Sequence, residues 1–114
     1  MIKLLTAIIR PHRLDAVRDA LVAAGVHGMT ATEVRGLADG PGHTEVYRGA
    51  EYTVEVTSMI RVDVMVDLFD AERLAGVIMA AARTDEAGDG KLWITDVDRV
   101  IRIRTGERGV DALH

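Results

Sequence analysis

IKLLTAII, at residues 2–9, is an almost continuously apolar stretch, and such a run is typical of a strand that is covered on both faces. A second stretch, IRVDVMVD at residues 60–67, alternates apolar and polar residues, so only one of its faces is apolar. The sequence therefore predicts two strands whose second faces have different surroundings.

Two segments with the spacing of amphipathic helices accompany these strands. The first has Pro11 near its start and Gly25 just past its end, which is the usual placement of these residues around a helix. The second follows Asp70, which we expect to act as its N-cap. The predicted inner faces consist of Leu14, Val17, Leu21 and Ala24 in the first helix and Leu74, Val77, Ile78 and Ala81 in the second. A glycine-bearing turn then leads into a strand at residues 91–97.

The segment GLADGPGHTEVYRGAEY, residues 36–52, is too long and too polar to be an ordinary connection. Its glycines and Pro41 predict hinge-like freedom and no regular structure at its base. Connections of this length inside a compact domain are usually functional or disordered. We therefore expect a flexible loop over about residues 37–56 that displays Tyr47 and Tyr52.

The order of elements is strand, helix, strand, long loop, strand, helix, strand. Two split βαβ halves of this kind predict an α+β, ferredoxin-like fold, with one antiparallel sheet, both helices on one face, and the long loop between the second and third strands. The other face of the sheet would be bare in a monomer, and an exposed apolar row is an aggregation hazard. Self-association is therefore expected, but these arguments do not choose the number of subunits.

Length and composition exclude several classes of function. The 114 residues suffice for a single domain, 1–114. The net charge of -4 argues against direct nucleic-acid binding, because neutralising phosphates requires a basic surface. The absence of cysteine excludes a disulfide framework and a thiolate metal site. With no leader-like start and no apolar run near the roughly 20 residues of a membrane span, we expect a cytoplasmic protein that meets membranes only through a partner.

Two arginines follow the last predicted strand, in the C-terminal segment 98–114. Arg102 and Arg104 alternate with apolar residues, so an extended chain would project both guanidiniums from one side, roughly 7 Å apart. Such a pair suits a polyphosphate. From spacing alone, charges on a solvated strand face are the commoner interpretation.

The turn DEAGDGK at residues 85–91, within a connection at 83–91, has the composition of an anion site. Gly88 and Gly90 let backbone N–H groups approach an anion, and Lys91 follows as a point charge for phosphate. The glycine spacing is not that of a Walker loop. A turn with no ligand remains the commoner meaning of such a stretch.

No other catalytic or metal-binding set is visible. The histidines, His12, His27, His43 and His114, are dispersed without metal-ligand spacing. Ser58 is the only serine and stands in no recognisable nucleophile motif. We therefore predict no bound metal at protein ligands and no enzymatic activity.

Together with IRIRTGERG at 101–109, the motif YRGAEY at 47–52 resembles the PII family of nitrogen and carbon signal-transduction proteins. The resemblance extends over almost the whole chain in the same order of segments: TAIIRP at 6–11, TEVRG at 32–36 and AARTDEAGDGK at 81–91. It implies a compact homotrimer with sheets facing a common centre and clefts between neighbouring subunits.

The resemblance also implies ATP or ADP as the ligand of these clefts. The turn would wrap the phosphates together with two arginines of a neighbouring subunit, while Thr30 and Asp63 would lie near the base and ribose. Asp63 replaces the commoner glutamate. The full set of expected nucleotide-binding positions is Thr30, Gly36, Asp63, Gly88, Asp89, Gly90, Lys91, Arg102 and Arg104.

Several positions depart from the family pattern. Gly40 stands where the family has the glutamine that helps to hold magnesium and 2-oxoglutarate, and Met59 replaces the lysine that pairs with 2-oxoglutarate. Magnesium would therefore lack its usual side-chain ligand, and binding of 2-oxoglutarate is expected to be weak. Tyr52 matches the tyrosine that many bacterial relatives expose to a nucleotidylyltransferase, whereas Ala50 replaces the serine that other relatives phosphorylate.

These features predict a non-catalytic signalling protein that binds ATP and ADP competitively. Its loop at about 37–56 would regulate a target of nitrogen or carbon metabolism, such as an ammonium transporter or a metabolic enzyme. One alternative is a relative that senses another metabolite or anion, such as bicarbonate, together with adenine nucleotide. Less favoured alternatives are a slow ATP hydrolase, which would need a magnesium site, and a structural adaptor without ligands.

Overall fold

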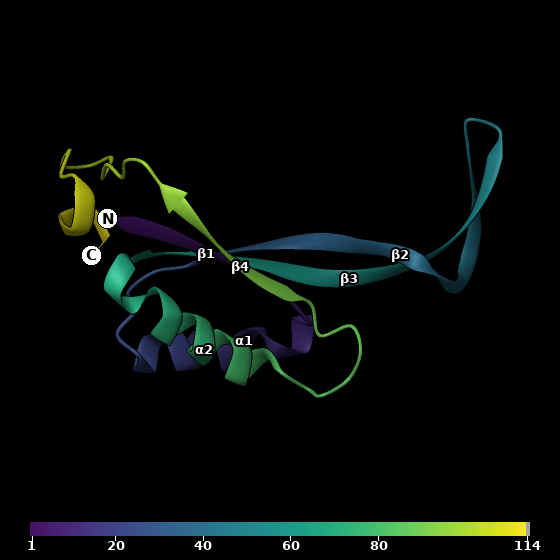
Figure 1. Ribbon diagram of the computed structural model, residues 1–114, viewed down its shortest axis with the longest axis horizontal. Helices are drawn as coiled ribbons and strands as arrows, with labels where there is room; N and C mark the ends of the chain where they lie inside the picture. Colours follow the sequence, from purple (N-terminus) through teal and green to yellow (C-terminus); the bar gives the residue numbers. More distant parts are fainter. Residues whose placement is uncertain (114) are drawn as a thin grey trace.

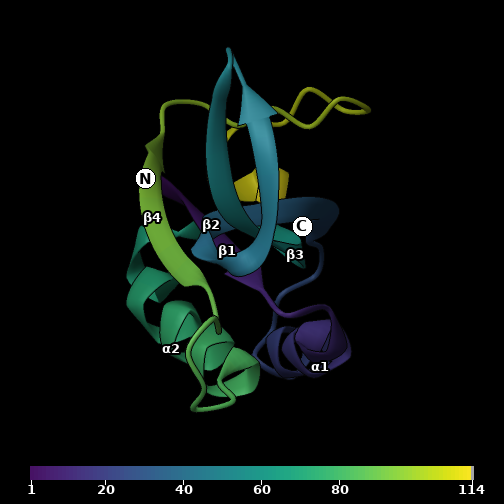
Figure 2. The same cartoon turned by 90° about the vertical axis from the view of Figure 1, so that its right-hand side faces the viewer.

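The computed structural model describes residues 1–113, with the side chains of all of them except 38–47 and 50–55. One antiparallel sheet has the strand order β2-β3-β1-β4, and both helices lie on the same side of it (Figures 1 and 2). The elements are β1 (Ile2–Ile9), α1 (Leu14–Ala23), β2 (Thr30–Tyr47), β3 (Ala50–Asp67), α2 (Ala71–Ala82) and β4 (Lys91–Val97), with 3₁₀ helices at Pro11–Arg13, Leu68–Asp70 and Gly109–Leu113. The predicted α+β, ferredoxin-like fold is confirmed.

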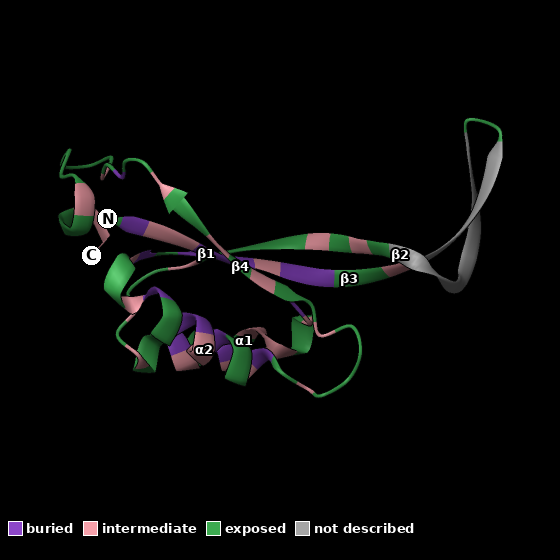
Figure 3. Ribbon diagram, viewed as in Figure 1, coloured by how far each residue is buried: buried purple, intermediate pink, exposed green. Residues whose placement is uncertain are grey.

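The core lies between the sheet and the helices, where the buried residues gather (Figure 3). β1 and β3 are the two inner strands of the sheet. The β1 residues Leu5, Ala7 and Ile9 face the helices together with the apolar residues of β3 that pair with them. The fully buried partners from the other elements are Val17, Leu21, Val62, Val64 and Ile78. The alternation at 60–67 therefore predicted the buried face of β3 correctly.

Neither α1 nor α2 lies on the opposite face of the sheet (Figures 1 and 2). Thr6 lies on this face and is fully buried, while Met65 and Trp93 are 48% and 41% exposed. Leu4 and Ile8 are half-buried on the same face. In a single chain this face thus remains partly apolar and open, as the sequence predicts.

The long segment between the second and third predicted strands forms a hairpin. β2 and β3 pair as far as Tyr47 and Ala50, and the register shifts between Asp39 and His43, which both pair with Val54. The expectation that the base of this segment lacks regular structure is therefore wrong for the backbone. A β-bulge inserts extra residues into one strand of a ladder, so Gly and Pro at this point do not end the pairing.

The tip of the hairpin is a two-residue turn. Arg48 and Gly49 both have positive φ, at 52° and 78°, and such turns join antiparallel strands because their twist matches that of the strands. This turn carries part of the YRGAEY motif, which the sequence analysis assigned to a loop. The Tyr52 side chain, which we expect to be displayed, lies outside the part of the chain whose side chains the structure describes.

The C-terminal segment is not the extended strand that its alternation predicts. After β4, Ile101 forms an isolated bridge with Arg108, and Arg102 N–H donates to Glu107 O at 2.9 Å. Gly106 has φ 76°, and its N–H donates to Arg102 O at 2.8 Å, which closes a turn. A Thr-Gly pair favours a turn, and turning lets the segment satisfy its own backbone groups. The two arginines therefore do not share one face of a strand.

Two arginines cap the helix C-termini, where the last carbonyl groups have no partner within the helix. Arg13 donates from Nε and Nη2 to Ala81 O near the end of α2, at 2.9 and 2.6 Å. Arg73 donates to Ala24 O at the end of α1, at 3.2 Å, and also to Asp70 at 3.1 Å. The two helices are thereby tied to each other.

The predicted N-cap role of Asp70 is right in position only. Asp70 stands at the N-cap of α2 but makes no capping hydrogen bond with its side chain, which instead accepts from Arg73. Asp67 is the residue that caps, because its carboxylate accepts from Phe69 N–H at 3.0 Å and starts the preceding 3₁₀ helix.

Replacement of Arg13 by Met tests the cap of α2. We expect the substitution to lower the free energy of unfolding by about 1 to 3 kcal/mol, because two charged hydrogen bonds to a helix carbonyl are lost. Urea denaturation at a fixed protein concentration measures the change. Arg18→Met is the control: among the described side chains, Arg18 pairs with exposed Asp15 and Asp19, and we expect a change below about 0.5 kcal/mol. Equal losses in the two variants would contradict the capping role.

Candidate functional site

The turn between α2 and β4 is organised around the carboxylate of Asp89. This carboxylate accepts from Thr84 N–H at 2.8 Å, from Asp85 N–H at 3.1 Å and from the Thr84 hydroxyl. Arg10, just after the last residue of β1, donates its Nε–H to the same carboxylate at 2.9 Å. The turn therefore holds an internal anion that bonds to its own backbone and to a neighbouring strand.

These hydrogen bonds determine the charge of Asp89. The bonds from the Thr84 hydroxyl, from Arg10 and from Thr84 N–H hold the pKa of the Asp89 carboxyl well below its usual range. A carboxylate whose pKa is depressed in the folded state stabilises the fold above its unfolded pKa, and the contribution disappears as the pH falls through the folded value. Asp89 thus stays ionised at neutral and mildly acidic pH.

Gly90 lies against the backbone of β1. It has φ 96°, and a Cβ atom on it would lie 1.7 Å from Ile8 O and 3.5 Å from Met59 Cε. Gly88 has φ 95°, and a Cβ there would lie 3.2 Å from Arg10 Nη2. Glycine is therefore required at 90 by both conformation and space.

Met59 connects the turn to the β2–β3 hairpin. Its side chain is buried, and its Cγ atom lies 3.6 Å from the position of a Cβ on Gly36. Since its Cε atom is next to Gly90, the side chain packs between Gly36 and Gly90. The structure thus brings together two glycines that the family resemblance assigns to an expected nucleotide site.

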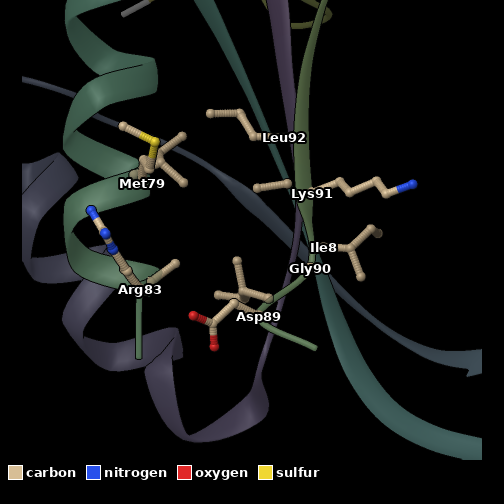
Figure 4. Close-up of a pocket in the computed structure, with 11 residues that line it drawn as sticks. Ile8, Met79, Arg83, Asp89, Gly90, Lys91 and Leu92 are labelled. Carbon is tan, nitrogen blue, oxygen red and sulfur yellow. The ribbon is translucent and has the colours of Figure 1, made fainter. Parts of the chain in front are cut away.

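Lys91 begins β4, pairs with Ile8, and is exposed. A mostly apolar cleft of about 310 Å³ lies between α2 and the β1–β4 edge, and Asp89 and Arg83 are part of its wall. Figure 4 shows the Lys91 side chain pointing away from Met79, Arg83 and Asp89. The ammonium group of Lys91 is therefore not in this cleft but on the side of the sheet opposite α1 and α2.

Thr30 and Asp63 are direct partners across β2 and β3. Asp63 accepts from Thr6 Oγ1 at 2.7 Å and from Arg61 Nε at 3.0 Å. Burial raises the pKa of the Asp63 carboxyl, but the hydrogen bonds from Arg61 and Thr6 and the charge of Arg61 outweigh it, so the pKa is lowered. Asp63 is thus an ionised, hydrogen-bonded group on the face of the sheet opposite α1 and α2.

Arg102 and Arg104 lie apart from the turn. Arg102 donates to Asp111 O at 2.8 Å and pairs with Glu107 at 3.1 Å, while Arg104 is exposed. The turn precedes β4 and the arginines follow it, so the seven residues of β4 separate them by about 20 Å. Figure 1 shows the turn and the C-terminal segment at opposite ends of this strand. One chain alone therefore does not bring these cations to the glycine turn.

Sequence reasoning missed Arg10 and Thr84. The Arg10–Asp89 contact joins positions 79 residues apart, so no local pattern announces it. Within the described part of the chain, no group of three or more His, Asp or Glu side chains is arranged to hold a metal ion. Of the helices among those residues, none is long and apolar enough to cross a bilayer.

Replacement of Gly90 by Ala tests the close approach to β1. A Cβ in contact with a backbone carbonyl forces the turn or β1 to move, so we expect the free energy of unfolding to fall by at least about 1 kcal/mol. Thermal or urea unfolding measures the loss. Gly28→Ala is the matched control, because a Cβ on Gly28 meets nothing within 4 Å. A Gly90→Ala protein as stable as this control would refute the contact.

Comparison with known proteins is consistent with this geometry. A family model described as "Nitrogen regulatory protein P-II" matches residues 2–107. The chain is 51% identical over 111 residues to a nitrogen regulatory protein P-II of Nostoc punctiforme, covering 97% of this chain and 99% of that protein. It is 45% identical to one of Azospirillum brasilense over the same shares. A crystal structure of Arabidopsis thaliana PII bound to citrate matches with a TM-score of 0.81 and 33% identity, over 98% of this chain and 89% of that one. The chain therefore belongs to the P-II family of nitrogen regulatory proteins.

Proposed function

We propose that this P-II protein binds ADP or ATP in clefts between the subunits of a homotrimer and controls a target protein through its β2–β3 hairpin. The family is one of regulatory signal-transduction proteins. The observation that carries the proposal is the turn with Gly88 and Gly90, which hydrogen bonds to Asp89 hold in place, followed by the exposed Lys91. Such a turn presents backbone N–H groups that suit phosphate oxygens, and a preformed turn lowers the entropic cost of binding.

The assembly completes the site in this proposal. Arg104 follows β4, whose seven residues span about 20 Å, so it lies at the opposite end of this strand from the turn of its own chain. A neighbouring subunit packed on the face of the sheet opposite α1 and α2 brings its arginines toward that turn. The same packing covers Trp93, Met65 and the fully exposed Ile103, which supplies the hydrophobic gain that a small domain needs.

The ligand set is narrower than that of the family pattern. Met59 is buried between two glycines, so its position offers an apolar contact where the pattern has a cation. We propose adenine nucleotide as the main ligand, with 2-oxoglutarate bound weakly or not at all. The alternative partner ligand is another small anion, such as bicarbonate. Citrate, bound in the Arabidopsis thaliana PII structure, is a further probe of this chemistry.

The remaining proposals concern partners. The hairpin at about 37–56 would contact an ammonium transporter or a nitrogen-metabolism enzyme in the cytoplasm, and a nucleotidylyltransferase would modify Tyr52. A ligand shifts the equilibrium between two conformations of the hairpin only if it binds one of them more tightly than the other. No catalytic role is proposed, because the chemistry of hydrolysis requires a magnesium site and a positioned water.

Titration calorimetry with ADP and ATP tests the binding proposal. We expect Lys91→Ala and Arg104→Ala each to cost about 1.5 to 3 kcal/mol of nucleotide binding, because each removes a charged hydrogen bond. Arg99→Ala, at another exposed arginine near the same strand end, should bind as the wild type does. Unchanged titrations for the first two variants would place the phosphates elsewhere.

A mixing experiment tests whether the site is shared between subunits. Neither Lys91→Ala nor Arg104→Ala alone forms an intact cleft, but trimers co-expressed from both contain a cleft with both native residues. We expect co-expression to restore a fraction of tight ADP sites, and sedimentation equilibrium to give three times the 12.4 kDa of one chain. If both cations came from one chain, mixing would restore nothing.

The expected weak binding of 2-oxoglutarate is tested by adding it with magnesium and ATP. We expect no tight binding to the unmodified protein. Gly40→Gln with Met59→Lys should recover affinity, since each restored charged or polar contact contributes about 1.5 to 3 kcal/mol. Gly40→Gln with Met59→Leu is the matched control, which keeps position 59 apolar. Tight binding by the unmodified protein would show that the two positions do not decide this ligand.

A further inference from the structure

We propose that Arg10 is a positioning residue that acts through Asp89 to order the turn between α2 and β4. We further propose that Asp89 promotes anion binding at this turn although it carries a negative charge. The inference rests on the proposed nucleotide site and deepens it. Arg10 directly follows β1 and reaches the turn with two donors. Its Nε–H bonds to the Asp89 carboxylate at 2.9 Å, and its Nη2 donates to Ala87 O at 2.7 Å.

These contacts hold the turn at two points, one on its backbone and one on a side chain. Ala87 is held through its carbonyl group, and Asp89 through a carboxylate that also binds Thr84 N–H and Asp85 N–H. The Arg10 and Asp89 side chains are 22% and 24% exposed, so the protein covers most of both side chains. Gly88 and Gly90, which have positive φ, lie within this framework. Without the clamp, these glycines leave the turn many conformations to lose on binding.

The same contacts define the role of Asp89. Its oxygens accept from the Thr84 hydroxyl, two backbone N–H groups and a guanidinium, so it is a positioning group within the turn and not a ligand. Two physical effects then oppose each other at this position. Simple charge repulsion predicts that removing the carboxylate strengthens phosphate binding. The clamp predicts that removing it weakens binding, because the turn loses its order.

The experiment uses Asp89→Asn, Arg10→Met and Arg10→Lys in the full chain, with ADP as the probe. ADP dissociation constants come from titration calorimetry, and hydrogen exchange reports the amides of residues 84–90 without ligand. Arg73→Met is the matched control, because Arg73 also donates to a carboxylate and to a main-chain carbonyl, at Asp70 and Ala24. Arg73 lies near the start of α2, whereas the turn follows the end of this helix.

We expect Asp89→Asn and Arg10→Met each to raise the ADP dissociation constant about tenfold or more, as for the loss of one charged hydrogen bond. Exchange at the Thr84 and Asp85 amides should quicken in both. Arg10→Lys should fall between Arg10→Met and the wild type, because a lysine pairs with Asp89 as a point charge but lacks the fork that reaches Ala87 O. The double variant should bind no more weakly than the weaker single one, because both changes break one clamp. Arg73→Met should lose stability but keep its affinity and its turn protection.

Tighter ADP binding by Asp89→Asn would overturn the inference and show that repulsion dominates. Unchanged exchange at residues 84–85 in Arg10→Met would also overturn it, as would an equal loss of affinity in Arg73→Met. If the wild type bound no ADP, the proposed function would fail and with it the role in anion binding. The exchange measurement, which needs no ligand, would still decide separately whether Arg10 orders the turn.

Discussion

The structure depends on the hydrogen bonding of β1 to a neighbouring strand along each of its two edges. This strand is hydrogen-bonded along both edges, to β3 and to β4, and one of its faces is sealed by both helices. Because it has no free edge, its ends are fixed in space. Two contacts to the turn start from the C-terminal end of β1. Ile8 O lies so close to Gly90 that no Cβ fits there, and the Arg10 side chain bonds to Asp89. The candidate site is therefore built on one of the two inner strands of the sheet.

The two βαβ halves solve the problem of helix ends in the same way. In each half a 3₁₀ helix precedes the α-helix, and an arginine near that start, Arg13 or Arg73, caps the C-terminus of the other helix. A guanidinium at a helix C-terminus both donates to orphan carbonyls and meets the negative end of the helix dipole. The turn that carries the phosphate proposal starts just past the Ala81 carbonyl capped by Arg13. The order of α2 and the order of the turn are thus connected.

Local patterns predicted the parts of the structure that local physics determines. The alternation at 60–67 gave the buried face of β3, and the limits of β4 at 91–97 followed from the glycine turn before it. The pairing of β2 and β3 was not predictable in this way, because a bulge at residues 39–43 hides a continuous ladder behind loop-like composition. The alternation at 100–104 was misleading, since alternation describes a strand only where a neighbouring strand supplies hydrogen bonds. Arg10 could not be found from a local pattern either, because its partner Asp89 lies 79 positions away. Thr84 bonds to Asp89 only five residues along the chain, but neither its type nor its spacing distinguishes it from an ordinary turn residue.

The carboxylate of Asp89 determines the charge balance at the turn, and therefore how much positive charge a neighbouring subunit must supply to bind a polyphosphate. The charge of Asp89 already neutralises that of Arg10. Of the three cations predicted for the nucleotide site, only Lys91 then lies next to the turn of its own chain. One ammonium does not balance several phosphate charges, and the other cations of the predicted site, on Arg102 and Arg104, belong to a segment about 20 Å away along β4. Charge balance thus links the proposed ligand to assembly: a ligand that binds only the completed cleft stabilises the subunit contact by mass action. Since Met59 packs against both Gly90 and Gly36, any displacement of the turn by that ligand also changes the packing at the root of the β2–β3 hairpin.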